Sequence, residues 1–345
     1  MTKQIMVGGV AVGGGAPVTI QSMCNTKTED AGATIEQILR LEQAGCEIVR
    51  VTVPTPEAAE AVETIKNSIH IPLVADIHFD YRLAIAAAEH GADKIRINPG
   101  NIGSPERVRM VADACRDHGV PIRVGVNSGS VEKGLLEKYG LCAKSLCESA
   151  LGHVKLLEDC GFEDICISVK ASDVAMTVEA NRLLSTLCDY PLHIGVTEAG
   201  TKERGILKSA AGIGALLLDG IGDTIRISLT DAPEEEAHAG GELLRALGLR
   251  SGVQFVSCPS CGRTEYDLIG TAKAVEARLR DKPWNITVAV MGCVVNGPGE
   301  ASHADYGIAG GKSEGVIFKH GEPVARVASD RLADALVELI ERENQ

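Results

Sequence analysis

The stretch EIVRVTVPTPEAAEAVETIKNSIHIPLVADI, residues 47–77, decides the fold. It begins with a short apolar segment, 47–53, and ends with a second one, 72–77. Between them lies a longer segment, rich in alanine and glutamate, that starts at Pro56. Short apolar runs bounded by proline or glycine favour buried strands, and the middle segment has the length and composition of a helix. The stretch therefore predicts one strand–helix–strand unit of a parallel sheet.

This unit repeats along the first 250 residues. Eight strands, each followed by a helical segment, are predicted over 18–23, 47–53, 72–77, 94–99, 121–127, 164–170, 191–197 and 224–230. Eight such units in this length of chain are typical of an α/β fold of the TIM type, the (β/α)8 barrel. The alternative is a doubly wound open sheet, which needs a Gly-rich nucleotide fingerprint between a strand and a helix. The glycines of VGGVAVGGG, 7–15, open no helix, so we favour the barrel.

The pattern changes near residue 250. The rest of the chain contains a strand, a loop with two cysteines, a helix over 270–281, a strand over 285–291, a second cysteine loop, a hairpin and a terminal helix. This order of elements is typical of a small α+β domain. We therefore expect two domains, a barrel over 1–250 and a smaller domain over 251–345.

Composition and charge exclude several classes of function. The chain has 345 residues, a net charge of −13 and 3% aromatic residues, so we expect it to bind neither nucleic acid nor an anionic membrane. No apolar run is long enough to span a bilayer. We interpret the N-terminal MTKQIMVGGVAVGGGAPV as a strand and a turn, with a signal peptide as the minor alternative. Eleven cysteines without a clear export signal favour the reducing cytoplasm.

Polar side chains recur on one face of the predicted strands, near their C-terminal ends. Alternate residues of a barrel strand point inward, and a purely structural barrel fills this inner face with branched apolar side chains. Five of the eight strands instead carry a cation there: Arg50, Arg96, Arg123, Lys170 and Arg226. A buried cation is costly unless an anion meets it, so the sequence predicts anions inside the barrel.

Two explanations of these five cations remain open. Internal ion pairs are one, because Asp76, Glu198 and Asp223 lie near the cations in the strand pattern. Five cations against three acids still leave an excess, in a chain that is otherwise acidic. Because arginine binds phosphate with two parallel hydrogen bonds, we favour the second explanation, a phosphorylated ligand and in particular a diphosphate.

Three of the cysteines form a pattern of their own, C-x2-C-x31-C. Cys258 and Cys261 stand in CPSC, and Cys293 stands in MGCVVNGPGE. Two thiolates two residues apart can bind one metal centre, which a third can complete. The centre is then either zinc, with a fourth ligand such as His303, or an iron–sulfur cluster with one iron that lacks a protein thiolate, near Glu300. Since this domain has no fourth cysteine, the spacing favours the cluster.

Several motifs together resemble one family. They are APVTIQSM, VRVTVP, ADIHFD, RINPGNIG, PIRVGVNSGS, GVTEAG, GDTIRISLT, CPSCGRTEYDL and MGCVVNGPGEASHADYG, in this order along nearly the whole chain. On these motifs the sequence resembles the 4-hydroxy-3-methylbut-2-en-1-yl diphosphate synthases, in their compact two-domain bacterial form. The resemblance implies a TIM-type barrel followed by a sulfite/nitrite-reductase-like domain that holds a [4Fe–4S] cluster.

The resemblance also implies roles for single residues of the smaller domain. The three thiolates of the cluster match Cys258, Cys261 and Cys293. The carboxylate on the fourth iron matches Glu300, and a side chain beside the cluster matches Asn296.

In the barrel, the resemblance implies a diphosphate site and an acid–base group. The residues that match the diphosphate binders are Arg50, Arg96, Arg123, Lys170, Asn127, His193 and Ser228. Glu198 matches a carboxylate proposed to take part in proton transfer. One position departs from the family pattern, since Cys24 stands where threonine is usual.

The implied reaction is the reductive ring opening of 2-C-methyl-D-erythritol 2,4-cyclodiphosphate, a step of the methylerythritol phosphate route of isoprenoid biosynthesis. Two electrons enter from flavodoxin or ferredoxin, and water leaves. The resemblance further implies a head-to-tail homodimer. Such a dimer answers a geometric difficulty, because the cluster domain follows the last barrel helix, whose C-terminal end points away from the mouth of its own barrel.

Two other functions remain open when the residues are taken alone. One is a barrel enzyme without redox chemistry that acts on a phosphorylated substrate and carries structural zinc in the smaller domain. The other is an iron–sulfur sensor or carrier whose barrel binds a regulatory phosphate. Metal content separates the first from a reductase, and turnover with a reductant separates the second.

Overall fold

The chain divides into two compact units. The computed structural model describes residues 1–293, 299 and 301–344. The units are Met1–Leu243 and Leu244–Gln345, and the division falls inside the helix α10, Pro233–Ala246. No helix in the described part of the chain is long and apolar enough to cross a membrane.

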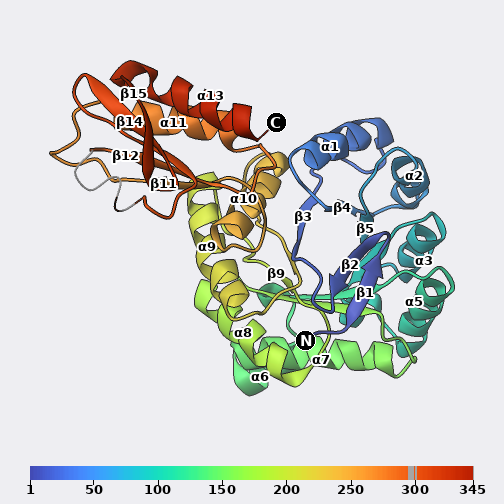
Figure 1. Cartoon of the computed structure of the whole chain (residues 1–345). Helices are drawn as coiled ribbons and strands as arrows, with labels where there is room; N and C mark the ends of the chain where they lie inside the picture. Colours follow the sequence, from blue (N-terminus) through green and yellow to red (C-terminus); the bar gives the residue numbers. More distant parts are fainter. Residues whose placement is uncertain (294–298, 300, 345) are drawn as a thin grey trace. The chain divides into compact units, whose positions relative to one another are not determined.

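The first unit is the predicted TIM-type barrel (Figure 1). Its eight strands run parallel in the order β8-β7-β6-β5-β4-β3-β10-β9. A parallel bridge between Ile167 and Leu192 joins the two outer strands, so the sheet closes on itself. All eight predicted strands are present: β3 (Thr19–Met23), β4 (Ile48–Thr52), β5 (Leu73–Asp76), β6 (Lys94–Ile97), β7 (Ile122–Asn127), β8 (Ile165–Lys170), β9 (His193–Ile194) and β10 (Thr224–Ile225).

Helices surround the barrel strands, and side chains cap the first turns of several of them. The Asp30 carboxylate accepts a hydrogen bond from the amide of Ala33 at the start of α1, and Thr55 does the same for Ala58 in α2. The helices of this unit are α1 (Ala31–Gln43), α2 (Pro56–Lys66), α3 (Tyr81–Glu89), α4 (Pro99–Ile102), α5 (Pro105–Asp117), α6 (Lys133–Tyr139), α7 (Ala143–Glu158), α8 (Val174–Leu187), α9 (Lys202–Leu218) and α10.

An N-terminal hairpin packs against the barrel. Its strands, β1 (Gln4–Val7) and β2 (Val10–Gly13), pair antiparallel, with Ile5 opposite Val12. Ile5, Val7 and Val12 are buried and form one cluster with Ile48, Val74 and Cys166, which lie near the starts of three barrel strands. The apolar face of the hairpin thus fills the N-terminal end of the barrel, and the opposite end is left to the polar residues.

The second unit is an α+β domain built on a five-stranded sheet of order β11-β12-β13-β14-β15. The first three strands are parallel, and β14 and β15 form an antiparallel hairpin. Leu268 and Val275 of α11, with Leu336 and Val337 of α13, join one apolar core with the sheet. Its elements are β11 (Gln254–Ser257), α11 (Leu268–Leu279), β12 (Thr287–Met291), β13 (Tyr306–Ala309), β14 (Glu314–Lys319), β15 (Glu322–Ala328) and α13 (Leu332–Glu343).

One strand of this domain was not predicted. The segment YGIA, β13, is short and follows the cysteine loop, so its sequence is typical of a loop. It forms a strand because it lies between β12 and β14, where all four residues are buried.

Two neighbouring residues of β1 test the role of the hairpin. Ile5 is 3% exposed in the core cluster, whereas the Met6 side chain points outward and is 50% exposed. We expect Ile5→Ala to lower the free energy of unfolding by about 2–5 kcal/mol, because it leaves a cavity in a packed core. Met6→Ala, the matched control, should change it by no more than about 0.5 kcal/mol. Denaturant unfolding followed by circular dichroism measures both, and equal losses would contradict this packing.

Candidate active site

The C-terminal ends of the barrel strands surround a cavity of about 320 Å³, which we call the mouth cavity. Every one of the eight strands, or the residues just after it, contributes to its wall. Its lining residues are Met23, Arg50, Thr52, Asp76, His78, Arg96, Arg123, Asn127, Ser168, Lys170, Thr197, Arg226 and Ser228. The structure therefore brings all five predicted inward cations into one cavity.

Asp76 is the carboxylate that meets two of these cations. Arg96 donates from Nη1 to Oδ1 of Asp76 at 3.1 Å, and Nε of Arg50 lies 3.9 Å from Oδ2. Burial tends to raise the pKa of Asp76, but Arg50 and Arg96 outweigh it and hold that pKa below its usual value. Asp76 therefore stays ionised, and a single negative charge is shared by two guanidinium groups.

Arg226 has a carboxylate partner that the sequence did not reveal. It donates from Nε and Nη2 to the two oxygens of Glu236, each at 3.0 Å. Glu236 lies in the first turn of α10 and is buried, and it also accepts hydrogen bonds from the Ser22 hydroxyl and the Leu229 amide. The sequence shows three successive glutamates, 234–236, and only the helix geometry decides which of them faces the barrel.

Lys170 and Arg123 have no carboxylate partner among the described residues. Arg123 donates from Nη1 to the Gln21 side-chain oxygen at 3.0 Å, while its buried Nε has no partner in the described part of the chain. Lys170 makes no hydrogen bond or ion pair within the described residues. Five cations thus face two carboxylates, Asp76 and Glu236, and the excess positive charge is left inside the mouth cavity.

The pKa values of three of these cations are lowered by burial and by mutual repulsion. Burial, and then repulsion from the neighbouring arginines, lowers the pKa of Lys170 well below its ordinary value. Burial also lowers the pKa of Arg50 strongly, and that of Arg123 to about 10. A bound polyanion would favour the charged forms and relieve this repulsion. The mouth cavity is therefore suited to a ligand with more than one negative charge.

Two glycines make room for the cations. A Cβ on Gly125 would collide with Nε of Arg96, which also donates from Nη2 to the Gly125 carbonyl at 3.3 Å. A Cβ on Gly195 would lie 3.0 Å from Nζ of Lys170 and 2.5 Å from the Arg226 carbonyl oxygen. Small residues at these two inward positions let long charged side chains cross the barrel.

Some residues assigned to this site by resemblance lie elsewhere. Asn127 and Ser228 line the mouth cavity, but His193 does not: it is 0% exposed, and neither ring nitrogen has a partner in the described part of the chain. Burial, and then nearby cations, lowers the pKa of His193 well below its usual value, so the ring is neutral. Glu198 is exposed just past Thr197, outside the lining, with a φ of 52° that side chains rarely adopt.

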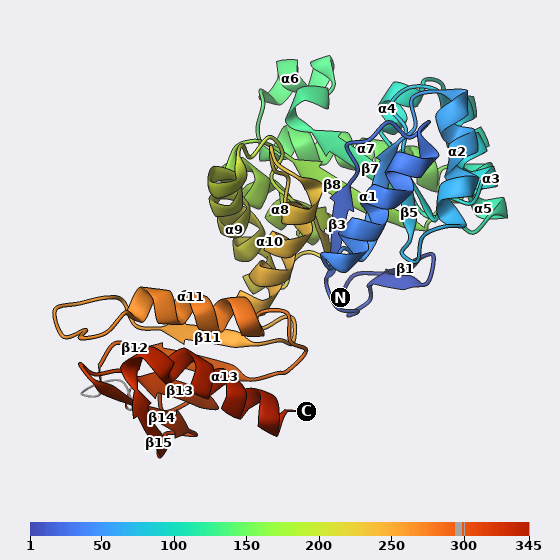
Figure 2. The ribbon, with the colours of Figure 1, turned by 90° about the horizontal axis from the view of Figure 1, so that it is seen from above.

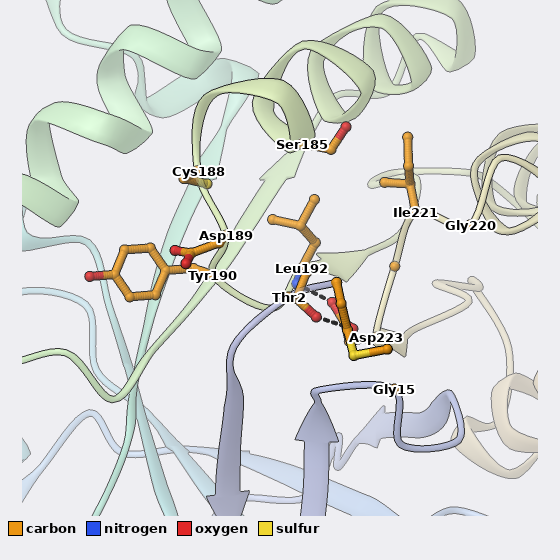
Figure 3. A pocket seen from close by; sticks show the side chains of 12 residues that line it. Thr2, Gly15, Ser185, Cys188, Asp189, Tyr190, Leu192, Gly220, Ile221 and Asp223 are labelled. Carbon is orange, nitrogen blue, oxygen red and sulfur yellow. Dashed lines mark hydrogen bonds between the residues drawn. The ribbon is translucent and has the colours of Figure 1, made fainter.

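Asp223, which the sequence offered as an ion-pair partner, lies at the other end of the barrel. It accepts hydrogen bonds from the Thr2 hydroxyl at 2.7 Å and from the Leu192 amide at 2.8 Å (Figure 3). It borders a second cavity, of about 430 Å³, beside the N-terminal ends of β9 and β10. Barrel enzymes bind their substrates at the C-terminal ends of the strands, so we assign the candidate active site to the mouth cavity.

The second unit holds the three patterned cysteines. Cys258 directly follows β11, and Cys293 comes two residues after its parallel neighbour β12. The Cys258 amide donates to the Val290 carbonyl at 3.1 Å, and a Cβ on Gly292 would lie 3.7 Å from the Cys258 sulfur. The two cysteine loops therefore leave the same end of adjacent strands.

This donor set fits a thiophilic metal centre. Hydrogen bonds from the Arg263 backbone and side chain lower the pKa of the exposed Cys261 thiol, which favours the thiolate form that binds metal. Over residues 1–293, 299 and 301–344, no three potential ligands, His303 included, lie close enough together to hold a metal ion. The predicted residues Asn296 and Glu300 lie outside the described residues.

Comparisons with known proteins cover both units. The family model of the GcpE TIM-barrel domain matches residues 2–241, and that of the GcpE protein C-terminal domain matches residues 254–342. A curated protein of Geobacter sulfurreducens named 4-hydroxy-3-methylbut-2-en-1-yl diphosphate synthase (flavodoxin) is 57% identical over 99% of this chain and 97% of its own length. One of the same name from Clostridium acetobutylicum is 56% identical over 99% and 98%.

Solved structures support the barrel fold alone. A truncated 3-deoxy-D-arabino-heptulosonate 7-phosphate synthase from Thermotoga maritima matches with a TM-score of 0.53 and 15% identity, over 72% of this chain and 94% of that chain. At this identity the likeness extends to the arrangement of strands and helices and no further.

Removal of the charge of Lys170 and removal of the charge of Arg226 should have different effects on the stability of the protein. Lys170→Met removes an unpartnered buried ammonium, so we expect unchanged or higher stability, with pyrophosphate binding about tenfold weaker or more. Arg226→Met leaves the Glu236 carboxylate buried without its partner and should destabilise the protein by about 3–5 kcal/mol. Thermal unfolding and isothermal titration calorimetry with pyrophosphate measure the two effects. A destabilised Lys170→Met protein would mean that Lys170 has a partner.

Binding of pyrophosphate should also be linked to proton uptake. The pKa of Lys170 is lowered in the free protein, so above that lowered pKa the amine is neutral, and a bound anion raises the pKa again. We therefore expect proton uptake on binding that grows as the pH rises through the lowered pKa. Calorimetry in buffers of different ionisation enthalpy measures it. Because pyrophosphate carries protons of its own, the test is the difference from Lys170→Met, and a zero difference would refute the linkage.

Proposed function

The chain belongs to the GcpE family, and from this premise we propose that it is an iron–sulfur oxidoreductase that opens the ring of 2-C-methyl-D-erythritol 2,4-cyclodiphosphate. The product is 4-hydroxy-3-methylbut-2-en-1-yl diphosphate, an intermediate of the methylerythritol phosphate route of isoprenoid biosynthesis. The observation that carries the proposal is the excess of cations in the mouth cavity, in a chain 57% identical over nearly its full length to a curated synthase of this product.

The mouth cavity supplies what a cyclic diphosphate needs. Its volume of about 320 Å³ is at the small end of ligand pockets, as suits a five-carbon substrate. Lys170 and Arg123 have free donors for phosphate oxygens, while Arg50 and Arg96 are held beside Asp76 and face the same cavity. Asn127 and Ser228 add neutral hydrogen-bonding groups to the wall.

The same residues would assist the bond cleavage itself. When the ring carbon–oxygen bond breaks, negative charge develops on the released diphosphate oxygen, and fixed cations stabilise it without reorganisation. Lys170 is best suited to this task, because burial and the arginines weaken its hold on a proton until an anion arrives. By resemblance to the family we assign a proton-transfer role to Glu198, which is exposed just past Thr197. The binding role that the resemblance implies for His193 stays a prediction, since this residue is buried outside the lining of the cavity.

We propose that Cys258, Cys261 and Cys293, with Glu300 as fourth ligand and Asn296 alongside, hold a [4Fe–4S] cluster in the domain that follows the barrel. When bound, such a cluster supplies single electrons and a Lewis-acidic iron. The supporting observation is that the two cysteine loops leave the same end of the adjacent parallel strands β11 and β12.

The same proposal implies an electron donor, an oligomeric state and a location in the cell. Flavodoxin is the proposed electron donor, since the curated relatives carry it in their names, and ferredoxin is the alternative. We propose a head-to-tail homodimer, in which the cluster domain of one chain covers the mouth cavity of its partner, and a cytoplasmic location. The expectations of no nucleic-acid and no membrane partner stay predictions.

Metal content and turnover of anaerobically purified protein test the proposal together. We expect about four irons per chain, brown absorption that bleaches on reduction, and conversion of the cyclodiphosphate with reduced flavodoxin. Cys258→Ser, Cys261→Ser and Cys293→Ser should each lose iron and activity, while Cys160→Ser, a half-buried cysteine in the barrel, should keep both. Stoichiometric zinc without colour, even after reconstitution with iron and sulfide, would contradict the cluster assignment. It would favour the alternative, a barrel enzyme without redox chemistry.

A further inference from the structure

One histidine outside the mouth cavity lies where two of its rim loops meet. His153 is in α7 on the outside of the barrel and is only 5% exposed. Its Nε2 lies 2.5 Å from a carboxylate oxygen of Glu132, in the segment between β7 and α7. A Cβ on Gly100, in the segment after β6, would lie 2.5 Å from the same nitrogen. Glu132, His153 and Gly100 therefore form one contact, which we call the rim contact.

The first of these loops leads directly from a cation of the site. Arg96 lines the mouth cavity near the end of β6, and Asn98 follows two residues later. The Asn98 side chain accepts a hydrogen bond from the Gly100 amide at 3.1 Å, so the backbone between them is a fixed turn. A displacement of Gly100 is transmitted over four residues to Arg96.

The second loop leads from a neutral residue of the site. Asn127 ends β7 and lines the mouth cavity. Its backbone amide donates to the Ser130 hydroxyl at 3.0 Å, and that hydroxyl donates back to the Asn127 backbone carbonyl at 3.0 Å, so the backbone of this turn is fixed. Val131 is buried next to Glu132. The path from Glu132 to Asn127 is therefore short and rigid.

The loop continues from Glu132 into the helix α6, which contacts α7 (Figure 2) and has no fully buried residue. The contact of Glu132 with His153 therefore joins the start of this helix to α7. Gly100 lies in α4, which also packs against α7.

We propose that His153 is a positioning residue for the mouth cavity: by touching Glu132 and Gly100 together, it fixes the two loops that carry Asn127 and Arg96. The inference rests on the proposed function in one respect, that the ligand held by these residues is a diphosphate. His153 touches no ligand itself, and its effect is on affinity through the spacing of groups on β6 and β7. Because these groups hold the diphosphate in the ground state as well as in the transition state, their displacement weakens binding and leaves kcat nearly unchanged.

Three variants and one control separate this role from simple packing. His153→Leu fills the space but removes the hydrogen-bonding nitrogen, whereas His153→Gln places an amide N–H near the position of Nε2. Gly100→Ala pushes on the ring from the other loop. Gly129→Ala is the matched control, because it lies in the same rim and its Cβ would meet nothing within 4 Å.

The measurements are KM and kcat for the cyclodiphosphate with the holoenzyme, and the Kd of inorganic pyrophosphate by calorimetry. We expect KM and Kd to rise about tenfold in His153→Leu and Gly100→Ala, with kcat within about twofold of wild type. His153→Gln should restore both values to within about threefold, and Gly129→Ala should match wild type. Melting temperatures taken alongside show whether a variant is merely less stable.

Each other outcome has one meaning. If wild type binds pyrophosphate but His153→Leu and Gly100→Ala bind it equally well, the positioning role is wrong. It is also wrong if His153→Gln is as impaired as His153→Leu, or if kcat falls as KM rises in proportion to lost stability. If wild type itself neither binds pyrophosphate nor converts the cyclodiphosphate, the proposed function fails instead.

Discussion

Five cationic side chains share the mouth of the barrel with two carboxylates, and much of the surrounding structure accommodates their mutual repulsion. Asp76 lies between Arg50 and Arg96, and Glu236 reaches in from α10 to bind Arg226 with both oxygens. Gly125 and Gly195 leave the space that the long side chains need. Such a site lowers the stability of the folded protein, since apolar side chains at these positions would pack the barrel at lower free energy. An excess of cationic side chains at the mouth favours an anionic ligand, which stabilises their charged forms.

At the opposite end of the barrel, apolar packing stabilises the fold. There the hairpin β1–β2 contributes Ile5, Val7 and Val12 to an apolar cluster with the first residues of the barrel strands. Buried polar groups are nevertheless present at this end too, since Lys94 begins β6 and His193 begins β9, and both are 0% exposed. The hairpin therefore adds apolar packing to a barrel whose interior is polar over much of its length.

The strand–helix repeat and the inward phase of the cations could be predicted because both depend on local periodicity. The depth of a side chain along the barrel axis and its partners from distant parts of the chain could not be predicted in this way. Alternation places His193 and Thr197 on one face, yet only Thr197 reaches the mouth cavity, because alternation gives no position along the barrel axis. Glu236 is one of three adjacent glutamates, and its role depends on a helix contacting β10. Asp223 has the right charge but lies at the wrong end of its strand. The family motifs, in contrast, assign site residues by their order along the chain, without geometry.

The apolar hairpin has a kinetic consequence for the proposed reaction. Because its side chains fill the N-terminal end of the barrel, the mouth cavity is a pouch and not a channel, and substrate and product must pass through the same opening. In the proposed assignment the cations hold the phosphates of the substrate, and the product keeps both of them. Bound product and incoming substrate then compete for one opening and one set of charges, so we expect the product to be a competitive inhibitor.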